Sequence, residues 1–401
     1  MPWPELSPMN VREQFIAEWE SGAFTMTELC ADYGVSRKTG HKWVNRHEAG
    51  GRRGLCDQSR RPHTSPHAIA PATAAILLAL RRRFPRWGAT KLLTLAAEAH
   101  PRLTWPSRST ICDLFRRHGL VKAQRYRRRR RERLGGPFPR VTHPNELWTT
   151  DFKGEFRTGD GRYCYPLTLR DASSRFVLRC HALLDRGYEG TRRQFERAFA
   201  EYGLPERIRS DNGHPFAGIG LAGLSQLSVW WIRLGIGLER IAPGRPEQNG
   251  SHEQFHAVLK AETTRPPAAS CRAQQRRFTE FCHIYNTIRP HAALDNRRPA
   301  HHYHRSPRPL PKHIPPIPYP PHLEIRRVSS TGSLTWRCHA LFLGTPLAGQ
   351  DVAFEEIANG VWTIRFADIA LGRYHDRTCR FKPIAPTSVG RSRAKPARAD
   401  L

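Results

Sequence analysis

The chain of 401 residues is long enough for roughly two to four domains, and its 65 Lys and Arg residues against 35 Asp and Glu residues give a formal net charge of +30. Clustered charge of this size favours a nucleic-acid partner over a merely soluble basic protein. Nine scattered cysteines without a C-x-x-C pair argue against a disulfide framework or a cysteine zinc site. The sequence contains no uncharged apolar run of about 18 residues, so we expect no membrane span. We therefore expect a cytoplasmic, nucleoid-associated protein with no membrane partner.

Residues 11–48 predict a helical DNA-binding unit within a first domain of residues 1–50. A short helix over 27–33 is followed by Gly34, which supplies a left-handed turn, and by Ser36, which can cap a second helix. The second helix is expected to pack back through Val35, Gly40, Trp43 and Val44. Four basic side chains then face outward, toward a DNA major groove: Arg37, Lys38, His41 and Lys42. A purely structural helical pair with a solvated basic face is the alternative interpretation.

A second helix-turn-helix DNA-binding domain is expected over residues 68–121, after a linker over 51–67 that is rich in Gly, Arg, Pro and Ser. Ser107 can cap a helix whose first residue, Arg108, would contact DNA. The apolar face of that helix consists of Ile111, Leu114 and Phe115. Residues 122–145 include five consecutive arginines and are expected to form a basic linker that follows phosphates.

Residues 146–304 change character and predict an α/β core. Three segments that alternate apolar and polar side chains, joined by turn sequences, predict an antiparallel meander. The later segments alternate helix and strand, so the order is β-β-β-α-β-α-β-α, which indicates a mixed five-stranded sheet with helices on its faces. The expected strands are 148–156, 162–170, 175–182, 207–210 and 236–242, and the expected helices are 191–202, 224–234, 249–262 and 271–288.

The C-terminal part divides into three segments. Residues 305–322 are rich in proline and predict an extended linker. Short alternating strands with glycine turns over 323–386 predict a small β-barrel, and 387–401 is a basic tail. The whole chain is therefore expected to be a multidomain α+β protein.

Three separated acids carry the chemistry. Asp151 lies in the first predicted strand of the core, Asp211 follows the fourth strand, and Glu253 lies in a helix. A few carboxylates on a basic protein can bring a divalent metal to a polyanion, which indicates cutting or joining of phosphodiester bonds. Asp211 could instead be a turn residue and Glu253 a solvated acid of a first helical turn. Asp151 is harder to dismiss, because a carboxylate buried in a strand without a partner costs several kcal/mol.

With these acids the strand order resembles a ribonuclease-H-like fold. The arrangement resembles the Asp-Asp-Glu transposase and integrase superfamily, and within it the integrase-core transposases of bacterial insertion sequences, with insertion-sequence family 481 the closest match. The resemblance runs from about residue 24 to 310 and is carried by residues 147–154, 210–213, 244–250, 253–262 and 285–294.

The resemblance implies that Asp151, Asp211 and Glu253 are catalytic and hold two Mg²⁺ ions, for which Mn²⁺ would substitute. It also implies cleavage by water to free a 3′-OH end, followed by attack of that end on target DNA. The expected partners are double-stranded DNA, both the terminal inverted repeats of an element and its target, and further copies of the chain, because two ends must be joined.

Three cationic or titratable residues lie near the acids. His256 and Lys260 follow Glu253 on one helical face, and Lys153 shares the strand face of Asp151. We expect all three to contact DNA near the cut, with plain surface charge as the alternative.

Glu247 is the alternative candidate for the third catalytic acid. The spacing from Asp211 favours Glu247, but Glu247 lies in a loop, whereas Glu253 lies inside a helix and matches the Gly-x-x-Glu setting of the family. We therefore predict Glu253.

Two other functions remain open from the sequence. A DNA-binding regulator with a silent core would use only the helix-turn-helix units, and the presence of all three acids argues against it. A ribonuclease-H-like nuclease would cut without joining, and two N-terminal DNA readers argue against that.

Overall fold

The computed structural model describes residues 7–58, 68–121, 141–242 and 246–384, and it divides into two compact units, 1–70 and 71–401. The arginine run at 127–131 and the tail at 387–401 lie outside the described residues. Within the described ranges no helix combines the length and apolarity that a membrane span requires.

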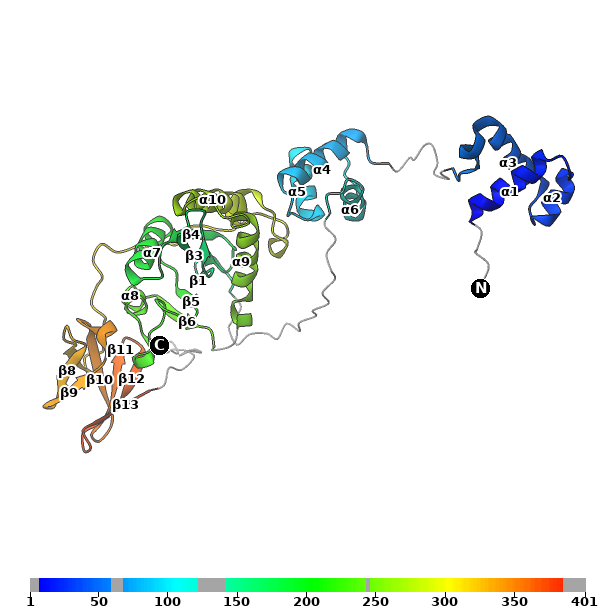
Figure 1. The fold of residues 1–401 in the computed structure, drawn as a ribbon. Helices are drawn as coiled ribbons and strands as arrows, with labels where there is room; N and C mark the ends of the chain where they lie inside the picture. Colours follow the sequence, from blue (N-terminus) through cyan, green and yellow to red (C-terminus); the bar gives the residue numbers. More distant parts are fainter. Residues whose placement is uncertain (1–6, 59–67, 122–140, 243–245, 385–401) are drawn as a thin grey trace, which may run out of the picture. The chain divides into compact units, whose positions relative to one another are not determined.

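The first unit consists of three α-helices and a short 3₁₀-helix (Figure 1). They are α1 (Pro8–Glu20), α2 (Met26–Asp32), α3 (Arg37–Gly50) and η1 (Gly51–Leu55). Gly34 has a φ of +61°, and the Ser36 side chain accepts a hydrogen bond from the Thr39 amide, so the predicted turn and cap between α2 and α3 are confirmed. The start of α2 is held by a capping box between Thr25 and Glu28.

The first unit extends further than the sequence indicated. Residues Gly51–Leu55, which we expected to be linker, form η1, and Leu55 is only 1% exposed. Its side chain completes an apolar core with Phe15, Ile16, Met26, Leu29, Cys30 and Val44. The prediction missed this because a lone leucine among Gly and Arg gives no periodic signal.

The second helical segment contains α4 (Pro71–Arg83), α5 (Ala89–Ala99) and α6 (Arg108–Arg117). Ser107 caps α6 by accepting from the Thr110 amide, as predicted. The predicted apolar face is buried and consists of Ile111, Leu114 and Phe115. Arg108 stays exposed at the first turn.

The core is a mixed sheet in which β3 pairs with β1, β2 and β4, and β1 continues to β5 and β6 (Figure 1). Its strands are β1 (Leu147–Phe152), β2 (Phe156–Arg157), β3 (Tyr163–Asp171), β4 (Val177–Leu183), β5 (Arg207–Ser210) and β6 (Gly237–Arg240). The β1–β3 and β3–β4 pairs are antiparallel, which confirms the predicted meander, while β1–β5 and β5–β6 are parallel. The two-residue β2 is a sixth strand beyond the five expected.

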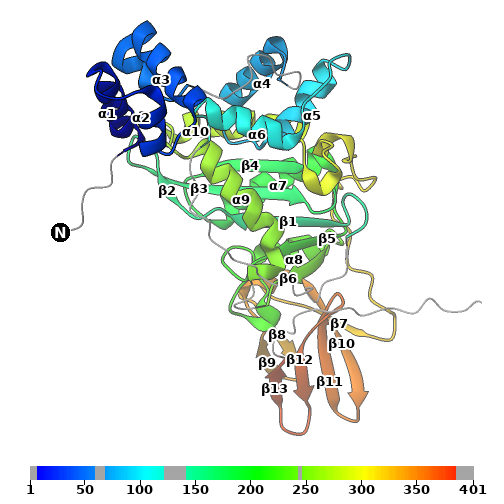
Figure 2. The same ribbon diagram turned by 90° about the vertical axis from the view of Figure 1, so that its right-hand side faces the viewer.

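Helices cover both faces of this sheet. The parallel pairs require crossovers, which α7 (Tyr188–Tyr202) and α8 (Gln226–Arg233) provide. These two helices lie on one side of the sheet, and α9 (Gly250–Thr263) lies on the other (Figure 1), where it runs across the strands beside α10 (Cys271–His283) (Figure 2). A π-helical turn, Ile284–Ile288, extends α10.

Alternation along the strands divides the core into two apolar layers. On the α7–α8 side the cluster includes Trp148, Leu167, Leu169, Phe195, Phe199, Ile208 and Trp231. On the α9–α10 side it includes Cys164, Cys180, Phe255, Leu259, Phe278 and Phe281. Asp151, three residues along β1 from Trp148, faces the α9 side.

The small barrel expected at the C-terminal end is not confirmed. The strands are β7 (Glu324–Arg327), β8 (Ser333–Trp336), β9 (His339–Phe342), β10 (Asp351–Ala358), β11 (Val361–Phe366), β12 (Ile369–His375) and β13 (Arg380–Pro383). Five of them form an open sheet in the order β13-β12-β11-β10-β7, and β8 and β9 form a separate ribbon. The apolar cluster between them also contains Leu224 and Val229 of the core domain.

Candidate active site

Asp151 and Asp211 meet because β1 and β5 are parallel neighbours. Their register pairs Thr149 with Arg209, so two residues further on the chain reaches Asp151 within β1 and Asp211 just after β5. Both side chains are only partly exposed. The structure therefore brings together the two aspartates that lie 60 positions apart in the sequence.

The charge of Asp211 opposes the ionisation of Asp151. Burial, and next the charge of Asp211, raise the pKa of Asp151 to about 7, and the charge of Glu253 adds to the rise. Burial also raises the pKa of Asp211, against a hydrogen bond from the Gly213 amide and the nearby charge of Arg186. A cation between the carboxylates would relieve this repulsion.

Glu253 lies in the first turn of α9 and is exposed. It acts on Asp151 through its charge, but within the described ranges no three His, Cys, Asp or Glu side chains are grouped closely enough to hold a metal ion. The fit to a hard divalent cation therefore rests on the oxygen donors of Asp151 and Asp211. It also rests on the burial and the charge of Asp211, which together raise the pKa of Asp151.

His256 does not lie where the sequence placed it. We expected its side chain to contact phosphate, but it is only 5% exposed and lies beneath Asp151. Its Nδ1 is 3.6 Å from Asp151 Oδ2, and its Nε2 is 2.8 Å from Thr168 Oγ1. Burial, helped by nearby Lys153 and Arg170, lowers its pKa to about 3, so the ring is neutral and not a phosphate-binding cation.

Three residues of this inner layer escaped the sequence analysis: Thr149, Thr168 and His252. His252 is fully buried, with Nδ1 at 2.8 Å from Thr149 Oγ1 and Nε2 at 2.7 Å from Thr168 Oγ1. A signal for both histidines was available. The buried positions of α9 include His252, Phe255, His256 and Leu259, which follow the i, i+3, i+4, i+7 stripe of a core-facing helix.

The two lysines lie at the rim of the site. Lys260 is exposed on α9, and Lys153 is half-buried just past β1. Burial lowers the pKa of Lys153, the charge of Lys260 lowers it further, and the charges of Asp151 and Glu253 oppose this. The lysines are therefore near one another and near the acids, as phosphate-binding groups at a cut would have to be, and DNA contact remains a prediction for both.

Two arginines of the sheet fix the N-terminal end of α9. Arg170, which is 2% exposed, donates to the main-chain oxygen of Ser251 at 2.9 Å and to its hydroxyl at 2.5 Å. Arg209 of β5 donates to the main-chain oxygen of Gln248 at 3.1 Å. The helix that carries Glu253 is thus attached to two strands of the sheet.

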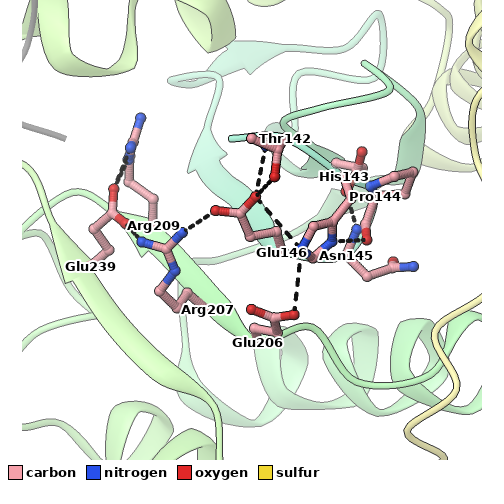
Figure 3. A network of polar contacts seen from close by, with 10 residues as sticks. Thr142, His143, Pro144, Asn145, Glu146, Glu206, Arg207, Arg209 and Glu239 are labelled. Atoms are coloured by element: carbon pink, nitrogen blue, oxygen red, sulfur yellow. Dashed lines mark hydrogen bonds and ion pairs between the residues drawn. The ribbon is translucent and has the colours of Figure 1, made fainter. Parts of the chain in front are cut away.

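A network of hydrogen bonds and ion pairs around Glu239 holds the Arg209 side chain in position (Figure 3). Glu239, which is 4% exposed, accepts from Arg209 Nε at 2.6 Å and from Arg207 Nη1 at 3.0 Å. Arg207 also donates to Glu146 at 2.7 Å, and Glu146 in turn accepts from the amide and hydroxyl of Thr142. One buried carboxylate therefore organises the ends of β5 and β6 around two arginines.

The residues expected to read DNA through the helical units lie at the surface. Arg37, Lys38, His41 and Lys42 are exposed on α3, and Arg108 is exposed on α6. Their exposure leaves them available to DNA, and their contacts with it remain predictions.

Comparison with sequence families gives four matches. Two families, each described as an integrase core domain, match residues 141–246 and 234–299. A helix-turn-helix domain matches residues 11–63, and a homeodomain-like domain matches residues 39–114.

Among curated proteins, the chain is 28% identical over 234 residues to the insertion element IS407 uncharacterized 31.7 kDa protein of Burkholderia multivorans, covering 57% of this chain and 79% of that protein. Among solved structures, the magnesium complex of the HTLV-2 integrase catalytic core domain in its trimeric form matches at 16% identity, covering 41% of this chain and 100% of its own, with a TM-score of 0.32. The simian T-cell lymphotropic virus intasome with the PP2A regulatory subunit B56 gamma matches at 15% identity, covering 73% and 97%, with a TM-score of 0.36.

Proposed function

The chain belongs to the integrase-core transposases of insertion sequences, with helix-turn-helix domains ahead of the core, and from this premise we propose that it cuts and joins DNA at the ends of its own element. The helical units would bind the terminal inverted repeats, and the core would free a 3′-OH end and join it to target DNA. Two ends must be held together, so the working form is a dimer or larger assembly on DNA.

The observation that carries this proposal is the pair Asp151 and Asp211 at the ends of neighbouring parallel strands, each with a raised pKa. Carboxylates crowded in this way suit divalent cations, and we propose that these two residues hold Mg²⁺, or Mn²⁺ in its place, with Glu253 as the third ligand and two ions in the complete site. Bound ions of this kind activate the attacking oxygen and stabilise the leaving oxygen of a phosphodiester.

The other residues of the site have supporting roles in this proposal. Lys153 and Lys260 bind the phosphates that flank the scissile bond, since both lie near the acids and one is exposed. The helix α9 holds Glu253 on a rigid element, which keeps a ligand in place better than a loop does. Arg37, Lys38, His41, Lys42 and Arg108 contribute the DNA contacts of the helical units.

The test compares Asp151→Asn and Asp211→Asn with the unchanged chain on duplexes that carry the DNA flanking the gene, in Mg²⁺ and in EDTA. We expect metal-dependent cleavage and end joining by the unchanged chain, and losses on the order of 10²–10³-fold or more in both variants with end binding retained. Asp295→Asn is the matched control, because Asp295 is an exposed acid of the same domain in a left-handed conformation that asparagine tolerates.

Two other results would overturn the proposal in different ways. End binding without cleavage, in either Mg²⁺ or Mn²⁺, would identify a DNA-binding regulator with a silent core. Cleavage without strand-transfer products would identify a ribonuclease-H-like nuclease.

A further inference from the structure

The hydroxyl of Thr168 is shared by three groups behind Asp151. Its Oγ1 lies 2.9 Å from the main-chain oxygen of Asp151, 2.7 Å from His252 Nε2 and 2.8 Å from His256 Nε2. Both imidazoles are buried, and Thr168 is fully buried. Three hydrogen bonds therefore converge on one oxygen between the strand of the first acid and the helix of the third.

The protons of this cluster can be assigned from valence together with the donor–acceptor distances. A hydroxyl has one proton and two lone pairs, and a main-chain carbonyl can only accept, so the Thr168 proton goes to Asp151. Both lone pairs of Thr168 Oγ1 must then accept from the Nε2–H groups of His252 and His256. A neutral imidazole has one N–H, so with Nε2 as the donor each Nδ1 is left without a proton.

The two Nδ1 atoms then have different surroundings. The Thr149 hydroxyl lies 2.8 Å from His252 Nδ1 and 3.3 Å from the main-chain oxygen of Arg170. Its single proton is assigned to the nearer acceptor, the unprotonated Nδ1 of His252. His256 Nδ1 faces Asp151 Oδ2 at 3.6 Å, which is too long for a hydrogen bond. This arrangement is the reverse of the common one in which a histidine N–H supports a ligating carboxylate, and it leaves Oδ2 of Asp151 without a donor from this ring.

We propose that the two histidines are positioning residues, which act through Thr168 to set the helix that carries Glu253 against the strand that carries Asp151. The sequence of α9 agrees with this role. Glu253 lies between the two histidines, and its side chain is exposed while theirs belong to the buried stripe of the helix. The inference rests on the proposed function, because it concerns the spacing of two of the proposed ligands.

The first test is the tautomer of each ring in the metal-free full-length chain. With ¹⁵N-labelled histidine, and with signals assigned by loss in His252→Gln and His256→Gln, both rings should show a protonated Nε2 and an unprotonated Nδ1. A protonated Nδ1 on His256, donating to the Asp151 carboxylate, would overturn the proposal whether or not the protein cleaves DNA.

The second test removes the shared hydroxyl. Thr168→Val keeps the branched shape and leaves two buried N–H groups without an acceptor, whereas Thr168→Ser keeps the hydroxyl. We expect Thr168→Val to weaken Mn²⁺ binding and slow cleavage by about 10- to 100-fold, with affinity for DNA ends unchanged, and Thr168→Ser to restore both. If Thr168→Val does not fold, His256→Leu and His256→Gln form the same comparison, since only Gln keeps an N–H near the Nε2 position.

His181→Asn is the matched control. His181 is a partly buried histidine on β4 whose cross-strand partner, Leu167, belongs to the apolar layer on the opposite face of the sheet. The Mn²⁺ affinity and the cleavage rate of His181→Asn should equal those of the unchanged chain. Equal Mn²⁺ affinity and cleavage in Thr168→Val and the unchanged chain would overturn the positioning role and leave the proposed function standing. An unchanged chain that binds Mn²⁺ yet cleaves no DNA would overturn the function alone.

Discussion

The guanidinium of Arg209 donates to the main-chain oxygen of Gln248 across 3.1 Å, and this contact joins the strand that leads to Asp211 to the chain that begins the helix of Glu253. Because Glu239 orients Arg209 from the neighbouring strand, the spacing of the second and third acids depends on a buried carboxylate that is itself outside the site (Figure 3).

We therefore predict that Glu239→Gln lowers both the stability and the cleavage rate of the protein. Removing one partner of a buried ion pair costs about 3–5 kcal/mol, and somewhat less here because the Arg207 side chain is 29% exposed. Denaturant unfolding and cleavage of an end substrate measure the two effects. Glu355→Gln is the control, since Glu355 pairs with Arg365 at 2.6 Å but both are about one-third exposed, so its loss should cost at most about 1 kcal/mol. Equal effects of the two changes would contradict the prediction.

A second prediction concerns pH in the absence of metal. Asp151 keeps its proton up to a pKa of about 7 in the folded chain, against 3.8 as its ordinary value, so between these values the folded state binds more protons than the unfolded state. The free energy of unfolding therefore falls as pH rises through this window, by at most about 1.4 kcal/mol per pH unit. Asp151→Asn removes this loss.

The measurement is urea unfolding in EDTA at about pH 4 and about pH 8. As the pH rises from about 4 to about 8, the free energy of unfolding of Asp151→Asn should increase relative to that of the unchanged chain. This gain should level off above pH 7, where Asp151 is ionised in both the folded and the unfolded state. A constant difference between Asp151→Asn and the unchanged chain at both pH values would mean that burial and the neighbouring charges do not raise the pKa of Asp151.

The sequence predicted those features that local chemistry decides. Gly34 and Ser36 mark a turn and a cap through their own backbone and side-chain preferences, and the period-2 segments gave the meander with Asp151 on its first strand. The meeting of Asp151 and Asp211 was also accessible, because neighbouring strands end together.

The features that were missed depend on contacts between distant segments. The role of Thr168 follows from its register opposite Asp151, and that of Arg209 from the path of the chain before α9, and neither leaves a local pattern. The prediction for His256 was wrong because it used only the spacing of His256 from Glu253 along the helix. His256 belongs to the buried stripe of α9, and this places its side chain toward the sheet and not toward DNA. Whether short strands close into a barrel depends likewise on pairing between the two edges, β13 and β7, of one sheet.

A third prediction concerns Gly40 in α3. A Cβ at this position would lie 2.6 Å from both Cys30 Sγ and Met26 Sδ, so the glycine allows α2 and α3 to approach. Overpacking costs about 1–3 kcal/mol, whereas the helix propensity of alanine returns about 1 kcal/mol, so Gly40→Ala should be destabilising by up to about 2 kcal/mol. We expect faster amide exchange in α2 and α3 and weaker binding of DNA ends. At Gly50 a Cβ would meet nothing within 4 Å, so Gly50→Ala should leave exchange and binding unchanged.

The last prediction decides the third acid. Glu247 belongs to the 3₁₀ turn Pro246–Asn249, ahead of α9, while Glu253 lies in the first turn of α9 and contributes to the raised pKa of Asp151. The helix is attached to the sheet through Ser251 and through the buried His252. Glu253 directly follows these two residues, so its backbone is held rigidly, as a metal ligand requires. Glu253→Gln should therefore abolish cleavage and joining while end binding survives, and Glu247→Gln should keep substantial activity. Each variant is the control for the other, because both lose one carboxylate within the same short segment. An inactive Glu247→Gln beside an active Glu253→Gln would transfer the assignment to Glu247 and leave Glu253 as a solvated acid of the helix.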